Sequence, residues 1–462
     1  MAVLTGHPTE ISRVLAKWIK QIRYEDFPVE VVQEAKRAFL DWLGSALAGA
    51  GKEPGQISLT LVEELGGNPE ATLLSNGKQT SCILAAFNNG VISHIVELDD
   101  VHKASILHAG AAIIPAALAA AEKVKADGRQ LIEGIVAGYE VGIRIGEAVT
   151  PSHYYYWHNT GTVGTFGAAA AAGKILGLTE EELVHAIGSA GTQAAGLWEF
   201  LADGAMSKHL HPAKASMNGL LAALLAQRGF TAATKILEGE KGFCKAMASE
   251  FDLSKVTSGL GQGEGYKILE NCYKIHSSCR HTHGGIDIAL QLRKEYSLIP
   301  EQIKKIVVRT YPIAIDITGN FNPDSVYAAK FSLPYCVALA LKEGKAGLRE
   351  FNDLNLNDQA IRELISKVTL LEDAEIAALY PAKWPTTVEI TDNHGNQYLG
   401  RTDYPQGDPE NSVTDEQLKA KFRDLTTSLH SLEKVEILIA SIFDLEHVKD
   451  LSGMLQRERS ES

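Results

Sequence analysis

The chain has 462 residues, of which 45% are hydrophobic and 22% are charged, and its formal net charge is −13. This length exceeds the size at which a single hydrophobic core keeps growing, so at least two domains are expected. The composition is that of an ordinary globular protein. The acidic balance argues against broad contact with nucleic acid or an anionic membrane, so an anionic ligand has to be held by a local basic cluster.

The N-terminal residues predict an amphipathic helix rather than an export signal. Apolar residues between positions 11 and 22 recur at helical spacing, and no basic segment precedes an apolar one. The chain has no run of about 18 strongly apolar residues that could cross a bilayer. Its five cysteines are irregularly spaced and form no CxxC pair, which is typical of reduced thiols. We therefore expect a cytoplasmic protein that does not enter a membrane.

Helical periodicity dominates from residue 8 to about residue 268. Apolar residues repeat every 3.6 positions in five long stretches, at 31–49, 81–97, 111–124, 128–149 and 179–196. The glycine-rich stretch 160–177 superficially resembles a phosphate loop, but it lacks both the GxxxxGK[ST] and the GxGxxG spacing. We interpret its small residues as surfaces for close helix packing.

The character of the sequence changes near residue 270. Residues 304–317 are β-branched and predict a strand, and residues 386–405 predict two strands joined by a polar turn. The segments between them have a helical period, and Thr414 with Gln417 forms a capping box for a last helical segment. The predicted fold is mostly α: an all-helical domain (1–268 plus 406–462) with a smaller α+β lid domain (269–405) inserted before the C-terminal helical return.

The first candidate site is the segment 97–110, ELDDVHKASILHAG, which connects two apolar helices. It brings together Asp99, Asp100, His102 and His108, and carboxylate with imidazole is the usual combination for moving protons near neutral pH. A solvated acidic loop is the first alternative. A metal site is the second, although the six-residue spacing of the histidines does not put both on one helical face.

Two further clusters lie in the helical half. Lys208, His209, His211 and Lys214 precede an apolar helix and predict an anion clamp, with two exposed lysines on a solvated face as the alternative. His158 lies just before the glycine-rich helix, where backbone N–H groups attract anions. A lone histidine at such a place is more often structural.

The last candidates lie at and beyond the predicted domain boundary, where clefts tend to form. Cys279, Arg280, His281 and His283 occur within five residues, and Lys330 follows on a predicted helix of the lid domain. The spacing alone does not supply a closed set of zinc ligands, so it favours catalysis or anion binding over a metal. The sequence contains no phosphate loop, flavin-binding motif or metal-binding motif. Its basic and imidazole clusters therefore predict a cofactor-free enzyme that acts on a small polycarboxylate.

Six blocks spread over the whole chain resemble, in order, those of the MmgE/PrpD family. The blocks are ISHIVELDDVHKASILHAGA, HNTGTVGTFGAAAAAGKILGL, DGAMSKHLHPAKASMNG, SSCRHTHGGID, AAKFSLPYCVALAL and DYPQGDPENSVT. This family includes 2-methylcitrate dehydratase, cis-aconitate decarboxylase and iminodisuccinate epimerase. The resemblance implies a helical domain with an α+β lid, usually a homodimer, that works on small polycarboxylates without a metal or another cofactor.

The resemblance implies site positions at His94–His102, His108, His158, Lys208, His211, Cys279 and His283, and the clusters described above add Arg280 and Lys330. Catalytic residues are expected at Asp100, His108, His158 and Lys208. Residues that bind the substrate are expected at Glu97, His102, His211, Cys279, Arg280, His283 and Lys330. Proton transfers are assigned to Asp100 and His108, and binding of the substrate carboxylates to Lys208, His158 and His283.

Three positions depart from the family pattern. Glu97 replaces an aspartate, Val101 replaces a threonine, and Cys279 stands where the decarboxylase has an active-site histidine. The expected reaction is therefore the dehydration of 2-methylcitrate in propionate catabolism. The alternatives are decarboxylation of cis-aconitate, epimerisation of an iminodisuccinate-type substrate, a metal-dependent lyase and a catalytically inactive polycarboxylate-binding protein.

Overall fold

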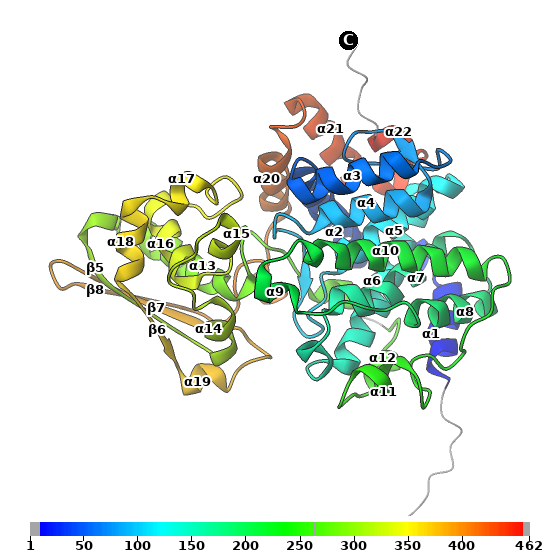
Figure 1. Ribbon diagram of the computed structural model, residues 1–462, viewed down its shortest axis with the longest axis horizontal. Helices are drawn as coiled ribbons and strands as arrows, with labels where there is room; N and C mark the ends of the chain where they lie inside the picture. The colour runs from blue at the N-terminus through cyan, green and yellow to red at the C-terminus, as the bar shows by residue number, and fades with distance from the viewer. Residues whose placement is uncertain (1–9, 263–264, 456–462) are drawn as a thin grey trace, which may run out of the picture. The chain divides into compact units, whose positions relative to one another are not determined.

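The structure is a computed structural model that describes residues 10–262 and 265–455, and these residues divide into two compact units (Figure 1). The first unit comprises the described parts of Met1–Ile95, Asp99–Asn271 and Asp415–Ser462. The second comprises Val96–Leu98 and Cys272–Thr414. The described residues are mostly helical, as predicted from the sequence.

Helices make up most of the first unit. Its longer helices are α1 (Ile11–Gln21), α2 (Val29–Ala50), α3 (Glu53–Leu65), α4 (Cys82–Ser93), α5 (Ala109–Val124), α6 (Gly128–Val149), α7 (Asn159–Ile175), α8 (Glu180–Gly191), α10 (Ser207–Ala226), α20 (Asp415–Thr426) and α21 (Leu432–Phe443). Its short elements are η1 (Tyr24–Asp26), η2 (His153–Tyr155), α9 (Phe200–Asp203), α11 (Phe243–Met247), α12 (Ser254–Thr257), η3 (Lys267–Glu270), η6 (Leu445–His447), α22 (Leu451–Leu455), β1 (Ala71–Thr72), β2 (Gln79–Thr80) and β3 (Val101–His102). Strand β4 (Asn271–Cys272) lies where the chain passes into the second unit.

Small residues allow the central helices to pack closely. A Cβ atom on Gly138 of α6 would stand 2.3 Å from the side chain of Ile113 and 2.9 Å from the carbonyl oxygen of Gly167 in α7. A Cβ on Gly167 would in turn stand 2.8 Å from the carbonyl oxygen of Gly138. The glycines therefore let the two backbones come together, which confirms that the glycine-rich stretch serves helix packing.

Side-chain caps mark where several of these helices begin. Asp127 before α6 and Thr179 before α8 each form a capping box, and Ser81 caps α4. Each cap gives a first-turn N–H group a partner that the helix itself cannot supply. Among the described helices, none is both long and apolar enough to cross a membrane.

The second unit is an α+β fold built on a four-stranded sheet. The strands are β5 (Ile303–Thr310), β6 (Val368–Glu372), β7 (Thr386–Asp392) and β8 (Gln397–Thr402), in the order β6-β5-β7-β8. Its helices are α13 (Arg280–Glu295), η4 (Pro300–Gln302), α14 (Pro312–Thr318), α15 (Val326–Ala329), α16 (Leu333–Glu343), α17 (Asp353–Leu356), α18 (Gln359–Ser366), α19 (Ala374–Ala377) and η5 (Pro409–Asn411). Helices α13 and α16 pack on each other and share one hydrophobic core with the sheet.

Two predicted elements of this unit were wrong in part. The strand predicted over 304–317 ends at Thr310, because Pro312 starts a helix, where its missing N–H costs nothing. The helical period predicted between the two strand regions includes residues 357–373, but the chain becomes a strand at Val368, which pairs in parallel with β5. Pairing with β5, which lies far away in the sequence, overrides the local period there.

The C-terminal segment returns to the helical unit, where α20 packs on α2. Phe422 is buried against Gly44, whose added Cβ would stand 3.0 Å from the ring. Lys421 forms an ion pair with the fully buried Asp41, with 2.6 Å between Nζ and Oδ1. The space left by the missing side chain of Gly44 and the buried carboxylate of Asp41 therefore fix where α20 packs on α2.

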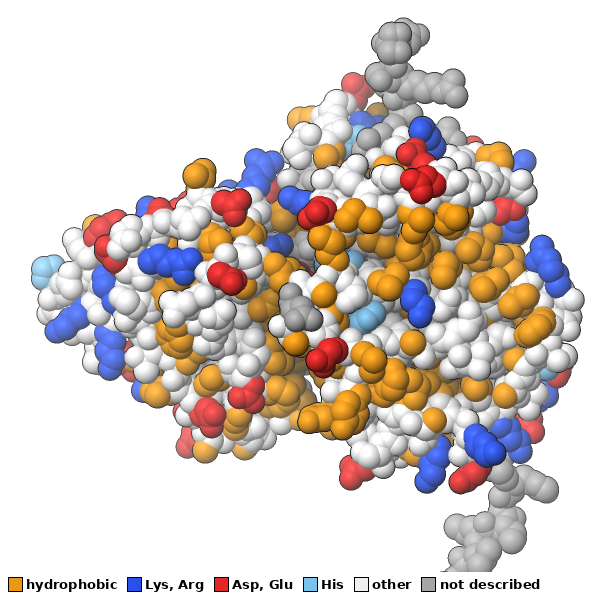
Figure 2. Space-filling model, in the orientation of Figure 1, with side chains coloured by type: hydrophobic (Ala, Val, Ile, Leu, Met, Phe, Trp, Pro, Cys, Tyr) orange, Lys and Arg blue, Asp and Glu red, His pale blue; other side chains and the backbone are white. Residues whose placement is uncertain are grey.

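Hydrophobic side chains also gather on the surface of the first unit, over α3, α4 and α10 (Figure 2). Ile57, Leu61 and Leu65 follow one another at four-residue spacing along α3 and are 46–64% exposed. Leu210 on α10 is 40% exposed. We call these four residues the apolar face. Exposed apolar surface of this kind is uncommon on a monomer.

Candidate active site

The segment between α4 and α5 holds the acidic residues and histidines that the sequence analysis singled out. His94 is the C-cap of α4 and His108 is the N-cap of α5, so two helix ends fix their backbones. Glu97 and Ile106, which lie between them, both have positive φ angles (59° and 49°). The chain therefore turns sharply between two rigid ends and brings side chains 14 positions apart into contact.

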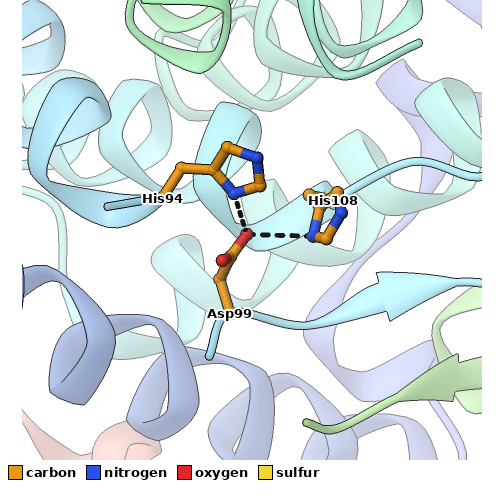
Figure 3. Close-up of side chains that lie close together, drawn as sticks. All are labelled: His94, Asp99 and His108. Atoms are coloured by element: carbon orange, nitrogen blue, oxygen red, sulfur yellow. Dashed lines mark hydrogen bonds and ion pairs between the residues drawn. The ribbon is translucent and has the colours of Figure 1, made fainter. Parts of the chain in front are cut away.

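One oxygen of Asp99 contacts both of these histidines (Figure 3). Its Oδ2 atom lies 2.7 Å from Nδ1 of His94 and 3.0 Å from Nδ1 of His108. The side chains of His94 and Asp99 are fully buried, and that of His108 is 13% exposed. The contact of His94 is a hydrogen bond in which Nδ1–H donates to the carboxylate, and that of His108 is an ion-pair distance. Both rings therefore turn Nδ1 toward Asp99 and leave Nε2 as the atom that can exchange a proton.

Burial and the two histidines act in opposite directions on the carboxyl group of Asp99. Burial disfavours the charged form, but the charge of His94 and His108 outweighs it and holds the pKa of Asp99 well below its usual range. Asp99 is therefore a permanent anion at neutral pH. An anion at Nδ1 orients an imidazole and sets its tautomer, as an aspartate does for a catalytic histidine.

More histidines lie next to this group. The rings of His94 and His158 are stacked with centroids 5.9 Å apart, and the ring of His209 is 6.5 Å from that of His94. Nδ1 of His158 lies 2.9 Å from Nδ1 of His211. Together with His108, these residues form what we call the histidine cluster, which comes from α4, α5, α10 and the start of α7.

The histidine pair His158 and His211 is neutral. Burial and the neighbouring positive groups lower the pKa of His158 well below its usual value and that of His211 to about 4. Lys208 is one of these positive groups for both residues and is itself 5% exposed. A hydrogen bond between two Nδ1 atoms also requires one of them to be unprotonated. The cluster thus combines neutral imidazoles with a cation.

Among the buried polar atoms of His94 and Asp99, two have no hydrogen-bond partner among the described residues. They are Nε2 of His94 and Oδ1 of Asp99. Buried polar atoms in folded proteins are nearly always paired, and exceptions mark sites where a ligand or water completes the set. The group therefore has the capacity to bind a small polar molecule.

Asp100, to which the sequence analysis assigned proton transfer, lies in a different environment. Its Oδ2 accepts hydrogen bonds from Tyr139 (2.5 Å) and Asn271 (2.8 Å), and its Oδ1 accepts one from the N–H of Gly110 (2.9 Å). Burial and the nearby Asp41 raise its pKa to about 7. The carboxyl group already accepts three hydrogen bonds. Two of them, from Gly110 of α5 and Tyr139 of α6, join the start of α5 to α6.

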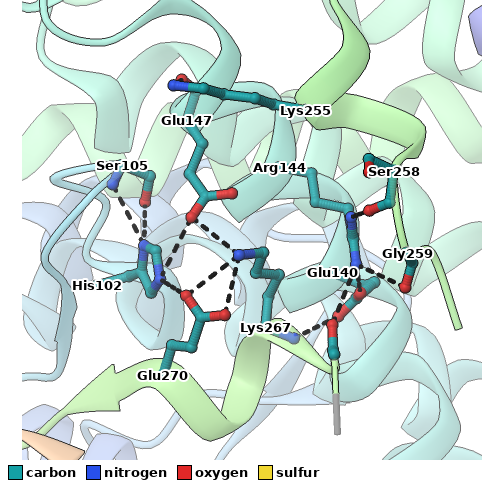
Figure 4. Close-up of polar contacts among 11 residues, drawn as sticks. His102, Ser105, Glu140, Arg144, Glu147, Lys255, Ser258, Gly259, Lys267 and Glu270 are labelled. Atoms are coloured by element: carbon teal, nitrogen blue, oxygen red, sulfur yellow. Dashed lines mark hydrogen bonds and ion pairs between the residues drawn. The ribbon is translucent and has the colours of Figure 1, made fainter. Parts of the chain in front are cut away.

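His102 belongs to a separate network with Ser105, Glu270 and Lys267 (Figure 4). Its Nδ1 accepts from the N–H of Ser105 (3.2 Å), so the ring carries its proton on Nε2, which lies 3.2 Å from Glu270. Lys267 bridges Glu270 (2.9 Å) and Glu147 (3.0 Å). Burial opposes ionisation of Glu270, but its bonds to His102 and Lys267 lower its pKa to about 2.

The second unit holds Glu97, together with its neighbours Val96 and Leu98. Glu97 pairs with Lys274 (3.2 Å), and both side chains are 2% exposed. Lys330 donates to the carbonyl oxygen of Val96 (3.1 Å), and Ser277 donates to the same oxygen (2.7 Å). A three-residue piece of the acidic segment is therefore held by the second unit, while Asp99 belongs to the first.

Arg280 and His283 lie inside the second unit. The guanidinium of Arg280 is ion-paired with Asp408 and donates to the carbonyl oxygens of Pro405 and Gln406. It also donates to Nδ1 of His283, whose Nε2 faces the carbonyl oxygen of Ser278 at 3.3 Å. Burial and the charge of Arg280 lower the pKa of His283 well below its usual value. Both residues thus have partners that fix the chain around position 408.

Cys279 is the N-cap of α13 and is partly exposed. His281, two residues on, stacks on Trp384 with ring centroids 4.5 Å apart and binds the hydroxyl of Tyr311 at 2.7 Å. Burial lowers the pKa of His281 to about 3. Of the four neighbouring candidates of this segment, Cys279 and His281 are partly exposed, whereas Arg280 and His283 are buried.

The residues that best fit a metal ion are those around Asp99. His94, Asp99 and His108 each offer one ligand atom within 4.8 Å of the others. Two imidazoles and a carboxylate are a common donor set for zinc or iron. A bound ion would, however, have to replace the protons that join Nδ1 of both rings to one carboxylate oxygen.

The structure thus brings together His108, His158, His211 and Lys208, as the sequence analysis expected for one site. It separates them from Asp100 and His102. Asp99 and His209 belonged to the predicted clusters without being assigned a catalytic role, and His94 was not among the predicted site residues. Asp99 and Asp100 are adjacent, and no local signal distinguishes the one that meets the histidines from the one that fastens a helix.

Comparison with known proteins identifies the family. A model of the MmgE/PrpD N-terminal domain matches residues 13–255, and a model of the C-terminal domain matches residues 276–445. The chain is similar to the cis-aconitate decarboxylase of Aspergillus terreus, with 26% identity over 472 residues that cover 96% of this chain and 95% of the relative. It is also similar to the cis-aconitate decarboxylase of Homo sapiens, with 29% identity over 441 residues that cover 91% of this chain and 89% of the relative. The chain therefore belongs to the MmgE/PrpD family.

Proposed function

We propose that this protein is a lyase that acts on a small tricarboxylate and uses the histidine cluster and Asp99 for proton transfer. The observation that carries this proposal is the single carboxylate oxygen of Asp99 that lies between Nδ1 of His94 and Nδ1 of His108. A fixed carboxylate at Nδ1 sets the tautomer, so Nε2 of either ring can take a proton from carbon or return one to it.

The remaining members of the cluster are suited to hold the substrate. Lys208 supplies a buried positive charge, and His158 and His211 supply neutral rings beside it. When the carbon next to a carboxylate loses a proton or a carboxyl group, negative charge builds up on that carboxylate. A positively charged side chain that is already in position stabilises this charge. We assign this role to Lys208.

The names of the relatives make cis-aconitate the first substrate to test. In this reaction the bond from carbon to one carboxylate breaks and carbon dioxide leaves. The electron pair stays on the carbon skeleton, conjugated with the double bond. An imidazolium Nε2–H of His94 or His108 then delivers a proton to carbon, and solvent restores that proton.

Dehydration of 2-methylcitrate is the second candidate, and the position of Cys279 favours it. The family resemblance puts a histidine of the decarboxylase at this position, whereas this chain has a partly exposed thiol at the N-terminus of α13. In dehydration a base removes the proton α to a carboxylate and an acid protonates the departing hydroxyl. The same Asp99-bound imidazoles serve as base and acid.

The experiment that separates these candidates is an incubation of chelator-treated protein with cis-aconitate and, separately, with 2-methylcitrate. Products are identified by mass spectrometry, and released carbon dioxide is measured. Loss of carbon dioxide from cis-aconitate supports decarboxylation, and a new conjugated double bond from 2-methylcitrate supports dehydration. Activity that chelator removes and zinc restores would contradict the proton-transfer proposal in favour of a metal at His94, Asp99 and His108.

Two broader expectations belong to this proposal. The apolar face over α3, α4 and α10 supports a homodimer, since such a surface is costly to leave in water. A place in the cytoplasm, which the irregularly spaced thiols favour, is part of this proposal. A role in propionate catabolism follows only if 2-methylcitrate proves to be the substrate.

A further inference from the structure

A cavity of about 280 Å³ lies in the first unit, between α1, the start of α6 and the loop that joins α7 to α8. Its floor is apolar, formed by Ile19, Leu178 and Leu183. Its polar wall consists of Lys20, Arg23, Gln130, Glu133 and Lys174. A cavity of this size accepts a small metabolite.

Positive charge exceeds negative charge in this wall. Three of its side chains are cationic, and among the described residues that line it Glu133 is the single carboxylate. Glu133 is already engaged, because it pairs with Lys174 (3.2 Å) and accepts from the N–H of Tyr24 (2.8 Å). The whole chain carries a net charge of −13, so this local excess of positive charge runs against the average of the molecule.

Two of the three cations keep unused donors. Nζ of Lys20 makes one hydrogen bond within residues 10–262 and 265–455, to the carbonyl oxygen of Gly177 at 3.3 Å. Among the residues that the structure describes, the guanidinium of Arg23 bonds through NH1, which donates to the carbonyl oxygens of Lys20, Gln21 and Ile22. The Nε–H and NH2 groups of Arg23 therefore remain for another acceptor.

The cations also repel one another. Burial lowers the pKa of Lys174, and the charges of Arg23 and Lys20 lower it further, although Glu133 works in the opposite direction. An anion bound between the three would remove this repulsion and supply acceptors for the unused N–H groups.

We propose that this cavity is a binding site for a small dianion, a carboxylate or a phosphate, that Lys20, Arg23 and Lys174 hold. The site is separate from the histidine cluster. Lys174 lies in the last turn of α7, whereas His158 is the N-cap of the same helix. A helix of 17 residues is about 25 Å long, so the two sites lie at opposite ends of α7.

Two substitutions test the cavity without removing a fold-defining contact. Lys20→Gln deletes one cation that makes a single exposed hydrogen bond. Gln130→Glu adds a negative charge to the wall and keeps the capping box of α6, because Glu accepts the N–H of Asp127 as Gln130 does. Lys17→Gln is the matched control, since Lys17 is exposed on α1 and does not line the cavity.

The measurement is calorimetric titration of the full chain with inorganic phosphate and, separately, with citrate, at matched ionic strength so that screening is constant. We expect saturable binding of at least one anion, about tenfold weaker in Lys20→Gln and in Gln130→Glu and unchanged in Lys17→Gln. Binding of phosphate alone identifies a phosphate site, and binding of citrate alone identifies a carboxylate site.

Turnover separates this proposal from the proposed function. Lys20→Gln is expected to keep wild-type kcat, and Asp99→Asn is expected to keep phosphate binding. Absence of saturable binding of either anion overturns the proposal. Equal affinity in the wild type, Lys20→Gln and Gln130→Glu also overturns it, because the anion then binds elsewhere, for example at Lys208.

Discussion

Asp99 and Asp100 show how adjacent identical residues acquire different properties from their surroundings. Asp99 faces two imidazoles, which hold its pKa well below the usual range even though burial opposes ionisation. Asp100 faces three neutral donors and the acidic Asp41, and burial raises its pKa to about 7. One carboxyl group is therefore a permanent anion, and the other changes charge near neutral pH.

Substitution of Asp99 by Asn tests the proposed proton transfer. The amide has almost the same shape but no charge, so it no longer fixes the orientation and tautomers of His94 and His108. We expect kcat to fall about 10²- to 10⁴-fold, with a smaller change in KM because the cationic Lys208 is untouched. Steady-state kinetics measure both parameters, with the substrate that the product assay identifies.

Asp444→Asn is the matched control for this substitution. Asp444 also pairs with a histidine, His447, at 2.7 Å, but both side chains are more than 60% exposed. Its variant is expected to keep wild-type kcat. If Asp99→Asn also keeps wild-type kcat, the histidine cluster does not carry the chemistry.

At the scale of elements, the central helices depend on positions that tolerate no side chain. Gly138 and Gly167 each face the carbonyl oxygen of the other, at distances below 3.0 Å from an added Cβ. Backbone cannot move aside as the end of a side chain can. The approach of α6 to α7 at these glycines therefore fixes the position of α7, whose N-cap is His158.

Gly167→Ala is expected to destabilise the first unit although alanine favours helix. The added methyl group would overlap the side chain of Ile113 and the backbone of Gly138, at a cost of about 1–3 kcal/mol in the free energy of unfolding. Gly51→Ala is the control, because an added Cβ there meets no heavy atom within 4 Å. Thermal unfolding followed by circular dichroism measures both, and equal midpoints would contradict close packing as the reason for glycine.

The C-terminal helices contribute a second testable contact. Phe422 is 1% exposed and packs on Gly44, so Phe422→Ala leaves a cavity between α20 and α2. We expect a loss of about 3–5 kcal/mol in the unfolding free energy of the first unit. The comparison variant is Phe230→Ala, since Phe230 is 56% exposed. Urea unfolding that is unchanged in Phe422→Ala would mean that the last helices are not part of the cooperative unit.

At the scale of the whole molecule, Asp100 links stability to pH. Its folded pKa of about 7 lies above its ordinary value of 3.8, so the folded protein binds this proton more tightly than the unfolded chain. Between these values the unfolded chain has lost the proton and the folded protein keeps it. The contribution of Asp100 to the unfolding free energy is therefore complete below pH 3.8 and is lost as pH rises toward 7.

The measurement is urea unfolding of the wild type and of Asp100→Asn at several pH values from 4 to 7.5. The variant has no proton to bind at this position, so the stability of the wild type relative to it should decrease steadily as pH rises. A difference between the two proteins that does not depend on pH would show that Asp100 stays ionised in the folded state.

The sequence by itself determined the mostly helical fold class, the family and the segments that hold the candidate site. Helical period and caps are local properties, so the beginnings of α6 and α8 could be predicted from Asp127 and Thr179. The six blocks that resemble the MmgE/PrpD family likewise need no knowledge of contacts, and the family models confirm the membership. Four residues of the histidine cluster could be singled out from composition and family pattern alone.

Tertiary structure decided what depends on partners distant in the sequence. Strand β6 exists because β5 lies beside it, and Asp99 rather than Asp100 meets the histidines because the backbone turns between Glu97 and Ile106. The cavity beside Lys20, Arg23 and Lys174 is likewise assembled from three separate helical regions. Periodicity shows which face of a helix or strand is apolar. The orientation and the charge of side chains at a buried site depend on neighbouring groups that only the folded chain brings together.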